Sequence, residues 1–374
     1  MTDFTLKYDF LEKLTNAWGP SGFEQEVQKM VRDYGKPYAD EVLYDKMGSV
    51  IFKKGTSGPK IMLSGHADEI GYMVREIAKN GTLKISNLGG IIPPYQPSNE
   101  ILIRPYKGSK DIIGIIQKSA SIGVKGKPEV TPLNKLHVDI GCKSKKEVKA
   151  LGIRVGDVAT QYAIYRTMDR TQVKKEEDGK KTKSEHRIAV AKAFDDRIGV
   201  FMGLEIMRRL KEENISHPNQ VYFASTTQEE VGLRGARTAA QMIQPDLGFS
   251  LDITPAKDAP GWTEKGHELG SGVVIHSKDG SMIANPRLKK FAIETAEENN
   301  INFQEGFLGF GGTDAGVIHI TGMGAPSLFI GISTRYGHSP RAMIDLDDVE
   351  NAVKLMIAMI KKFDTDTVAS FTKL

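Results

Sequence analysis

The sequence has little cysteine, no long apolar run and no leader-like start. Cys142 is the only cysteine among 374 residues, so an intramolecular disulfide is excluded and a reducing compartment is expected. No apolar stretch is long enough to span a bilayer. The start, Met1-Thr2-Asp3-Phe4, lacks the basic and apolar regions of a signal peptide. These absences predict a cytoplasmic protein that does not enter a membrane.

An excess of charge of one sign is also missing. The chain sets 51 Lys and Arg against 47 Asp and Glu, which leaves a net charge of +4 with no obvious patterning. Composition therefore gives no support for binding to nucleic acid or to a membrane surface. Hydrophobic residues at 40% and charged residues at 26% describe an ordinary globular protein, long enough for one large or two ordinary domains.

Helical and strand-like patterns alternate at the two ends of the chain. Strand-like apolar runs are separated by stretches with helical spacing, which predicts a mixed or parallel α/β sheet. The expected strands are 42–44, 50–53, 60–64, 221–224, 247–253 and 325–330. The expected helices lie within 5–35 and at 198–210, 236–242, 286–299 and 346–363.

The middle of the chain has a different character. Between about residues 71 and 186, many short apolar runs are separated by glycine, proline and lysine, which predicts a small β-barrel or sandwich. We therefore expect a discontinuous α/β domain, 1–70 and 187–374, interrupted by a β-rich insertion at 71–186. The polar run at 174–181 predicts an exposed loop within that insertion.

One predicted strand end carries two adjacent carboxylates. Glu229 and Glu230 follow the apolar run at 221–224 and precede a glycine-rich turn. Like charges this close repel each other, and burying them is costly unless a cation is present. The pair indicates a metal site in which one glutamate binds metal and the other moves a proton. A solvated acidic pair at the start of a loop is the alternative.

Four more strand ends carry side chains that can bind a metal. His66 closes the strand at 60–64 with Asp68 two residues on, and Asp252 lies within an apolar strand. Asp195 and Asp196 precede a helix that either could cap, and His338 lies in a polar loop after 325–330. The carboxyl ends of strands meet at one edge of an α/β sheet. Imidazole and carboxylate without thiolate suit two ions such as Zn²⁺, Co²⁺ or Mn²⁺.

Two such ions about 3.5–4 Å apart would form a hydrolytic site. A serine hydrolase is disfavoured because no Gly-x-Ser-x-Gly elbow is present, and the sequence has neither a P-loop nor a His-Glu-x-x-His motif. Paired carboxylates also suit a glycosidase. That chemistry needs no histidines at strand ends, however, and two tryptophans are few for stacking on sugars. A non-catalytic scaffold would not need the full set of acids and histidines.

Four motifs, together with the glycine-rich segment around Thr313 and Asp314, resemble the M42 family of metalloaminopeptidases. These are the tetrahedral TET aminopeptidases, a group with glutamyl, lysyl, leucyl and deblocking activities. The motifs stand in family order and span essentially the whole chain. They are His66-Ala67-Asp68-Glu69-Ile70-Gly71, Ala193-Phe194-Asp195-Asp196-Arg197, Thr227-Gln228-Glu229-Glu230-Val231-Gly232-Leu233-Arg234-Gly235-Ala236 and Arg335-Tyr336-Gly337-His338-Ser339.

The resemblance implies a role for each of these residues. His66 and Asp252 would hold one ion, Glu230 and His338 the other, and Asp195 would bridge both. In addition, the resemblance makes Asp68 the residue that orients His66 and Glu229 the general base. It places Thr313 and Asp314 near the substrate, where Asp314 contacts the substrate amine or stabilises its loop. The other histidines match no ligand position and are interpreted as structural or surface residues.

The same resemblance implies a fold, cofactors and partners. The fold would be a three-layer α/β/α metallopeptidase domain of the phosphorylase/hydrolase-like type, with an inserted β-barrel dimerisation domain. Each subunit would bind two divalent ions, Zn²⁺ or Co²⁺ with Mn²⁺ as a further option, and act on peptides. Dimers would assemble into a tetrahedral dodecamer. Some relatives are described as endoglucanases, so action on glycosides is kept as an alternative, as is a scaffold of the same fold.

Overall fold

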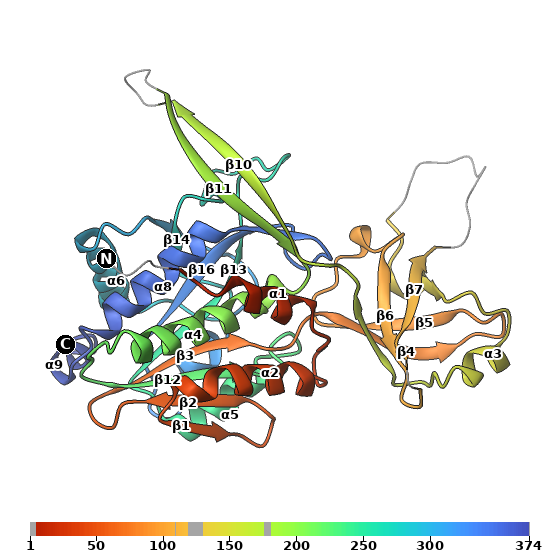
Figure 1. The fold of residues 1–374 in the computed structure, drawn as a ribbon, viewed down its shortest axis with the longest axis horizontal. Helices are drawn as coiled ribbons and strands as arrows, with labels where there is room; N and C mark the ends of the chain where they lie inside the picture. Colours follow the sequence, from red (N-terminus) through yellow and green to blue (C-terminus); the bar gives the residue numbers. More distant parts are fainter. Residues whose placement is uncertain (1–4, 109, 119–129, 176–180, 374) are drawn as a thin grey trace.

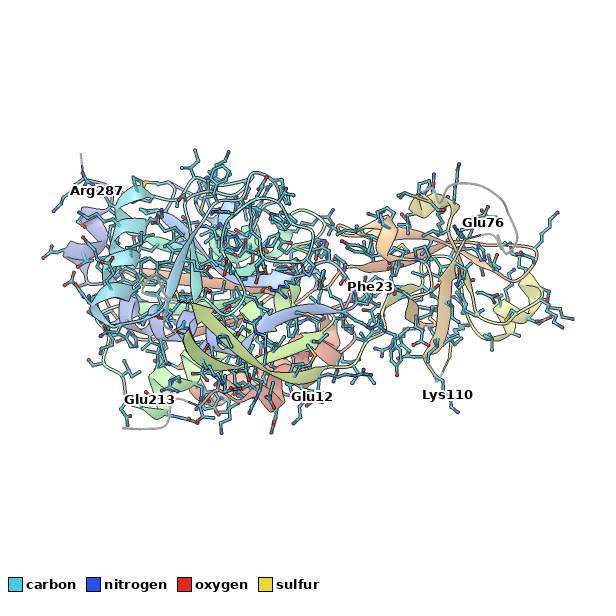
Figure 2. The ribbon with its side chains drawn as sticks, turned by 90° about the horizontal axis from the view of Figure 1, so that it is seen from above. Glu12, Phe23, Glu76, Lys110, Glu213 and Arg287 are labelled. Atoms are coloured by element: carbon cyan, nitrogen blue, oxygen red, sulfur yellow. The ribbon has the colours of Figure 1, made fainter. Side chains whose placement is uncertain are left out.

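The computed structural model describes residues 5–108, 110–118, 130–175 and 181–373. Figure 1 shows two bodies, a larger α/β body that carries both ends of the chain and a smaller β-barrel beside it. In Figure 2, Phe23 lies where the two bodies meet, whereas Glu76 and Lys110 lie on the barrel. At this junction Arg104 of the barrel contacts Glu26 at 2.8 Å, and its guanidinium lies 4.2 Å from the ring of Trp18.

The larger body is built on an 11-stranded sheet. The central strands β12, β3, β13 and β16 are parallel, so their carboxyl ends meet at one edge. Along the sheet the order is β1 (Glu41–Tyr44), β2 (Val50–Lys54), β12 (Gln220–Thr226), β3 (Lys60–His66), β13 (Leu247–Pro255), β16 (Ser327–Arg335), β17 (Ala342–Asp345), β11 (Lys181–Ala191) and β10 (Arg166–Lys175). Off this path, β14 (Val273–His276) pairs with β16 and with β15 (Phe303–Gly306).

Helices cover both faces of this sheet, which makes the three layers. One set of helices contributes side chains to the larger core cluster. These are α1 (Tyr8–Asn16), α2 (Gln25–Gly35), α4 (Phe194–Glu212), α6 (Pro286–Glu298), α8 (Leu346–Ile360) and, after it, α9 (Thr365–Ser370). A separate core cluster packs α5 (Arg234–Ile243) and α7 (Ala315–Ile318). Short 3₁₀ turns follow α2 (Lys36–Tyr38) and lie in the barrel (Pro93–Tyr95, Leu133–Lys135). The predicted α/β/α architecture is confirmed.

The start of α4 is packed directly on the end of β3. A Cβ on Gly65 would lie 2.4 Å from the backbone carbon of Gly199, and a Cβ on Gly199 would lie 2.0 Å from the carbonyl oxygen of Leu251. Only glycine allows two backbones to approach this closely. The close approach brings the Asp195–Asp196 turn next to His66.

The barrel closes through six strands and has its own apolar core. Their order around the barrel is β4 (Gly71–Ile77), β5 (Leu83–Leu88), β8 (His137–Asp139), β7 (Ile112–Gln117), β6 (Glu100–Arg104) and β9 (Val158–Gln161). A short helix, α3 (Lys145–Ala150), begins at Ser144, whose side chain accepts a hydrogen bond from the Glu147 N–H. The predicted insertion is therefore a closed barrel rather than a sandwich.

After the barrel the chain forms a long hairpin of β10 and β11, which projects from the larger body (Figure 1). The prediction of a loop at 174–181 is wrong at both ends of that range. Residues 174–175 and 181 lie in strands, and Lys175 pairs with Lys181. Residues 176–180 lie outside the described part of the chain. Since β11 also pairs with β17, the hairpin belongs to the main sheet, and the expected boundary at 186/187 falls inside β11. Among the described residues, no helix is long and apolar enough to cross a membrane.

Candidate active site

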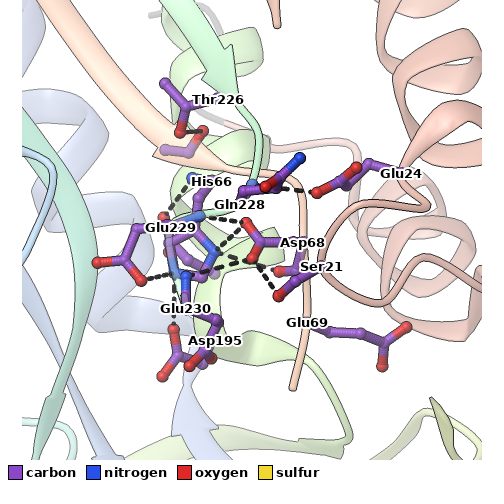
Figure 3. A network of polar contacts seen from close by, with 12 residues as sticks. Ser21, Glu24, His66, Asp68, Glu69, Asp195, Thr226, Gln228, Glu229 and Glu230 are labelled. Carbon is purple, nitrogen blue, oxygen red and sulfur yellow. Dashed lines mark hydrogen bonds and ion pairs between the residues drawn. The ribbon is translucent and has the colours of Figure 1, made fainter. Parts of the chain in front are cut away.

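The expected site residues gather where the central parallel strands end, and Figure 3 shows His66, Asp195, Glu229 and Glu230 close together there. His66 is the last residue of β3, and the turn with Glu229 and Glu230 directly follows β12. Asp252 lies in the second half of β13, and His338 lies in the loop after β16. Together with Asp195 at the start of α4, five segments far apart in the sequence therefore contribute to one neighbourhood, as the pattern of strand ends predicts.

Asp195 lies between the two histidines. Its Oδ1 is 3.0 Å from Nε2 of His66, and its Oδ2 is 2.8 Å from Nε2 of His338. Burial alone would raise the pKa of Asp195, but the two imidazoles hold it well below its usual range. Each oxygen of one carboxylate thus faces a different imidazole, which is the arrangement that a carboxylate bridging two cations requires.

Glu229 and Glu230 are buried beside these groups. Glu229 Oε2 lies 3.6 Å from His66 Nε2, and Glu230 Oε1 lies 3.9 Å from His338 Nε2. Burial raises the pKa of Glu230 to about 7 and that of Glu229 well above its usual range. Within the described part of the chain, Glu230 Oε1 is buried without a hydrogen-bond partner. A buried acceptor without a donor, among crowded acids, is a position that a cation would occupy.

Asp252 completes the set at the end of β13. Burial and the nearby Asp195 carboxylate raise the pKa of Asp252 well above its usual range. Ligand atoms of His66, Asp196 and Asp252 lie within 4.8 Å of one another, and so do those of His66, Asp195 and Glu230. The donor atoms are imidazole nitrogens and carboxylate oxygens, which fits zinc-like divalent ions.

Asp196 belongs to the first of these two groups. The sequence predicts it only as a possible helix cap. Its Oδ1 accepts a hydrogen bond from the Gly199 N–H at 2.9 Å, so it caps the regular part of α4 that follows the non-helical residues Asp195 and Asp196. Its Oδ2 accepts a hydrogen bond from the His66 N–H at 3.0 Å. The peptide bond between Asp195 and Asp196 is cis. Asp196 therefore ties the helix start to the end of β3.

Asp68 lies on the far side of the His66 ring from Asp195. Its Oδ1 is 3.3 Å from His66 Nδ1, as expected of a residue that fixes the ring. The two oxygens of this fully buried carboxylate also accept hydrogen bonds from the Glu229 N–H at 2.9 Å and the Glu230 N–H at 3.2 Å. Asp68 thus contacts both the expected ligand His66 and the backbone of the acidic turn.

In the glycine-rich segment around Thr313 and Asp314, the two side chains make different hydrogen bonds. Asp314 Oδ2 accepts a hydrogen bond from the Thr226 hydroxyl at 2.7 Å, and its buried Oδ1 has no partner in the described part of the chain. Burial raises the pKa of Asp314 to about 6. Thr313 is also buried, and its hydroxyl donates to Asp279 at 3.0 Å. Asp314 therefore has a free oxygen, whereas Thr313 is already bound within the loop.

The structure adds two features that sequence reasoning missed. The carbonyl of Gly90, in the loop after β5 of the barrel, lies 2.7 Å from His338 Nδ1. Behind the site, Glu69 lies 2.7 Å from Lys192 and 3.3 Å from Arg197, and all three are buried. Glu69 and Arg197 lie within two of the motifs and Lys192 directly precedes one, which was the one available signal. Nothing local in the sequence points to Gly90.

One of the remaining histidines also has acidic neighbours. His186 Nδ1 lies 2.7 Å from Asp345 Oδ2 and 3.6 Å from the exposed Asp347, while its Nε2 lies 2.7 Å from the Ser184 hydroxyl. Both ring nitrogens are thus engaged within the fold. This agrees with the structural role that the sequence predicts for His186.

Comparison with known proteins agrees with this geometry. The family model described as M42 glutamyl aminopeptidase matches residues 48–355. The chain is 32% identical to the lysyl aminopeptidase of Pyrococcus furiosus, over 95% of this chain and 97% of the relative. It is 30% identical to the glutamyl aminopeptidase of Lactococcus lactis subsp. cremoris, over 97% and 98%.

Two solved structures show the same fold. The TET aminopeptidase of the marine sediment archaeon Thaumarchaeota archaeon SCGC AB-539-E09 superposes with a TM-score of 0.88 at 37% identity, over 98% of both chains. The TET1 peptidase of Pyrococcus horikoshii, described as assembling into a tetrahedron or a large octahedral shell, gives 0.78 at 27% identity over 94% and 98%. The chain therefore belongs to the M42 family of aminopeptidases and is a peptide hydrolase.

Proposed function

We propose that this peptide hydrolase is a dinuclear metal-dependent aminopeptidase that removes the first residue from peptides with a free amino end. The observation that carries the proposal is the position of Asp195, whose two oxygens face two different histidines. His66 and Asp252 would hold one ion, and Glu230 and His338 the other, with Asp195 shared. The ions that suit these ligands are Zn²⁺ or Co²⁺, with Mn²⁺ as a further option.

When bound, the two ions would supply Lewis acidity, which polarises the scissile carbonyl and makes water a stronger acid. Glu229 would take a proton from the attacking water as its oxygen bonds to the carbonyl carbon. The same carboxyl would then give that proton to the amine that leaves when the C–N bond breaks. Asp68 would hold the His66 ring. The buried hydrogen bonds of Asp314 with Thr226 and of Thr313 with Asp279 support roles for both residues in holding the loop.

The experiment that tests this proposal separates the two glutamates. Glu229→Gln is expected to keep two ions per subunit and to lower kcat by about a thousandfold, which is the range for loss of a general base. Glu230→Gln is expected to lose metal as well as activity. Metal would be counted by mass spectrometry, and turnover measured on aminoacyl chromogenic substrates after each ion is added back to stripped protein. Near-normal turnover of the Glu229→Gln variant would exclude Glu229 as the base. The control is Glu12→Gln, on the exposed face of α1.

The same substrate panel would also show which first residue is preferred. The two relatives named above carry opposite names in this respect, lysyl and glutamyl, at nearly the same identity to this chain. The family motifs are therefore compatible with either preference. The substrate panel would show which side chain the enzyme prefers at the first residue of the peptide.

We also propose that the subunits assemble as dimers through the barrel and that the dimers build a tetrahedral dodecamer. The support is the match to a TET1 peptidase that forms a tetrahedron or an octahedral shell. Within each subunit, residues 1–70 and 187–374, together with the β10–β11 hairpin of the main sheet, would be the catalytic domain. The single cysteine supports a reducing, cytoplasmic setting.

A further inference from the structure

The backbone of the acidic turn adopts conformations that need support. Gln228 has a φ of 55° and Leu233 a φ of 54°, both in the left-handed region that residues other than glycine rarely adopt. Such conformations persist when surrounding contacts hold them. The contacts that hold this turn therefore decide where the carboxylate of Glu229 lies.

Three consecutive N–H groups of the turn donate to carboxylates from two other segments. The Glu229 and Glu230 N–H groups donate to the two oxygens of Asp68 at 2.9 and 3.2 Å. The Gln228 N–H donates to Oε1 of Glu24 at 3.0 Å, and these two residues are 204 positions apart. Figure 3 shows Glu24 approaching the turn from the side opposite Glu229.

Glu24 belongs to the segment Gly19–Glu24, between α1 and α2, which contacts the turn directly through Glu24 and indirectly through Asp68. Ser21 donates its hydroxyl to Asp68 Oδ2 at 2.6 Å, and Glu24 Oε1 also accepts the Gly22 N–H at 2.7 Å. Ser21 and Glu24 are 5% and 3% exposed, so water does not replace these contacts. Both side chains therefore hold the carboxylate of Asp68 and the backbone that surround Glu229.

This segment is itself fixed to the layer behind the site. The Gly19 carbonyl accepts the Glu69 N–H at 3.1 Å, and the Gly19 N–H donates to Glu69 Oε1 at 3.2 Å. Glu69 in turn is paired with Lys192 and Arg197. The connection thus runs from buried ion pairs through Gly19–Glu24 to the acidic turn. The segment Gly19–Glu24 itself lies upstream of residues 48–355, the part that the family model matches.

We propose that Ser21 and Glu24 are positioning residues for the general base: the segment Gly19–Glu24 sets the backbone of the Gln228–Glu230 turn and thereby the position of the Glu229 carboxylate. This inference rests on the proposed role of Glu229. Neither side chain reaches the reacting atoms. Their effect is on the geometry of the base, and small displacements of a reacting group lower rates steeply.

The test compares variants that lose the acceptor or the hydroxyl with variants that keep it. Glu24→Ala and Ser21→Ala are expected to lower kcat about tenfold or more with KM changed less than about twofold, at two ions per subunit. Glu24→Gln retains an acceptor oxygen, and Ser21→Thr retains a hydroxyl, so both are expected to restore most of kcat. Glu26→Ala removes a half-exposed carboxylate on α2 and should leave kcat unchanged.

Hydrogen exchange of the Gln228–Glu230 amides gives a readout that does not depend on activity. Exchange should be faster in Glu24→Ala and Ser21→Ala and close to the wild-type rate in Glu24→Gln. If the wild type is active and both alanine variants keep its kcat and exchange, the positioning role is wrong and the proposed function stands. If the wild type has no aminopeptidase activity, the proposed function fails, and exchange still decides whether the segment holds the turn. Ser21→Ala keeps the test open if Glu24→Ala does not fold.

Discussion

Charged side chains are buried in two layers at this site. The outer layer is the set of acids and histidines around Asp195, and the inner layer is Glu69 with Lys192 and Arg197. Lys192 also donates to the Ala17 carbonyl at 2.9 Å, and Arg197 to the Leu14 carbonyl at 2.6 Å. Buried ions are tolerated when every charge has a partner and a hydrogen bond. The inner layer meets that condition through one carboxylate.

Removing that carboxylate should therefore be costly. Glu69→Gln leaves two buried cations whose remaining partners are carbonyl oxygens, and we expect the free energy of unfolding to fall by about 3–5 kcal/mol. Chemical denaturation at pH 7 would measure the change. Glu76→Gln, which removes an exposed partner of Lys84, is the control and should leave the midpoint where it is. Equal midpoints for the two variants would mean that the inner layer contributes nothing to stability.

Two buried histidines away from the site make stability depend on pH. Burial, and then the neighbouring His267, lower the pKa of His276 to about 3, and burial lowers that of His267 to about 4. His276 is fully buried, and its ring stacks on Phe329 at 4.1 Å. Both histidines thus stay neutral in the folded protein at pH values where an unfolded chain binds protons.

The direction of the effect follows from proton uptake. Between about pH 6.5 and pH 4 the unfolded state binds more protons, so stability present above pH 6.5 is lost as the pH falls. We expect His276 to account for about 2 kcal/mol of the loss between pH 7 and pH 5. Thermal unfolding of His276→Leu across this range should show a shallower decline than the wild type. An identical decline would contradict the assignment.

At the scale of elements, helix ends were predictable where the signal is local. The helix expected at 286–299 runs from Pro286 to Glu298, and Asn285 caps it by accepting the Arg287 and Leu288 N–H groups. Asp345 caps α8 by accepting the Asp347 N–H at 3.0 Å. Asp348 stands where a capping-box residue would, but it accepts the Gly270 and Gly272 N–H groups at 2.8 and 2.7 Å.

The Asp348 contacts give a prediction for the loop before β14. Asp348→Ala leaves two N–H groups of that loop without their acceptor, and each such group costs about 1–3 kcal/mol when buried. We therefore expect a loss of about 2–4 kcal/mol in the free energy of unfolding, measured by denaturant titration. Asp347→Ala, in the same helical turn but exposed, should cost less than about 0.5 kcal/mol. A similar cost for both would point to a general effect of charge at the helix start.

The site contacts that the sequence could not predict share a physical cause. Most candidate ligands were predictable because they stand at or just after the ends of apolar strands, and parallel strands bring such ends together. Asp195 differs, because it stands at the start of α4. The contacts of Glu24 with Gln228 and of Gly90 with His338 join loops separated by 204 and 248 residues, and no local pattern encodes such pairs. The β10–β11 hairpin was missed for another reason. Its two strands carry many charged residues between 166–175 and 181–187, so they lack the apolar alternation by which strands are recognised.

At the scale of the whole molecule, the barrel carries an apolar surface outside its core. On β7 the side chains alternate, with Ile116 buried inside and Ile113 and Ile115 exposed outside by 49% and 43%. The strand is paired on both sides, with β6 and β8, so its backbone is not open for another strand. An outward pair of isoleucines on a paired strand is a surface that a second subunit could cover.

The final prediction joins this surface to the proposed assembly. If β7 lies in the contact between barrels, a variant with both Ile113→Glu and Ile115→Glu should disrupt it. The two isoleucines contribute on the order of 3 kcal/mol per subunit when covered, and buried carboxylates without partners oppose association. Sedimentation of the wild type at micromolar concentration should give about twelve times the 41.2 kDa subunit mass, and the double variant a much smaller species.

Activity separates loss of assembly from loss of fold. Because the candidate site lies in the larger body, the dissociated variant should keep its turnover of short aminoacyl substrates within about twofold. It should also begin to trim folded proteins with free amino ends, which a closed shell excludes. Met242→Glu, on the exposed face of α5, is the control and should sediment as the wild type does. A double variant that still forms the full assembly would place the contact elsewhere on the barrel, and a monomeric wild type would overturn the dodecamer itself.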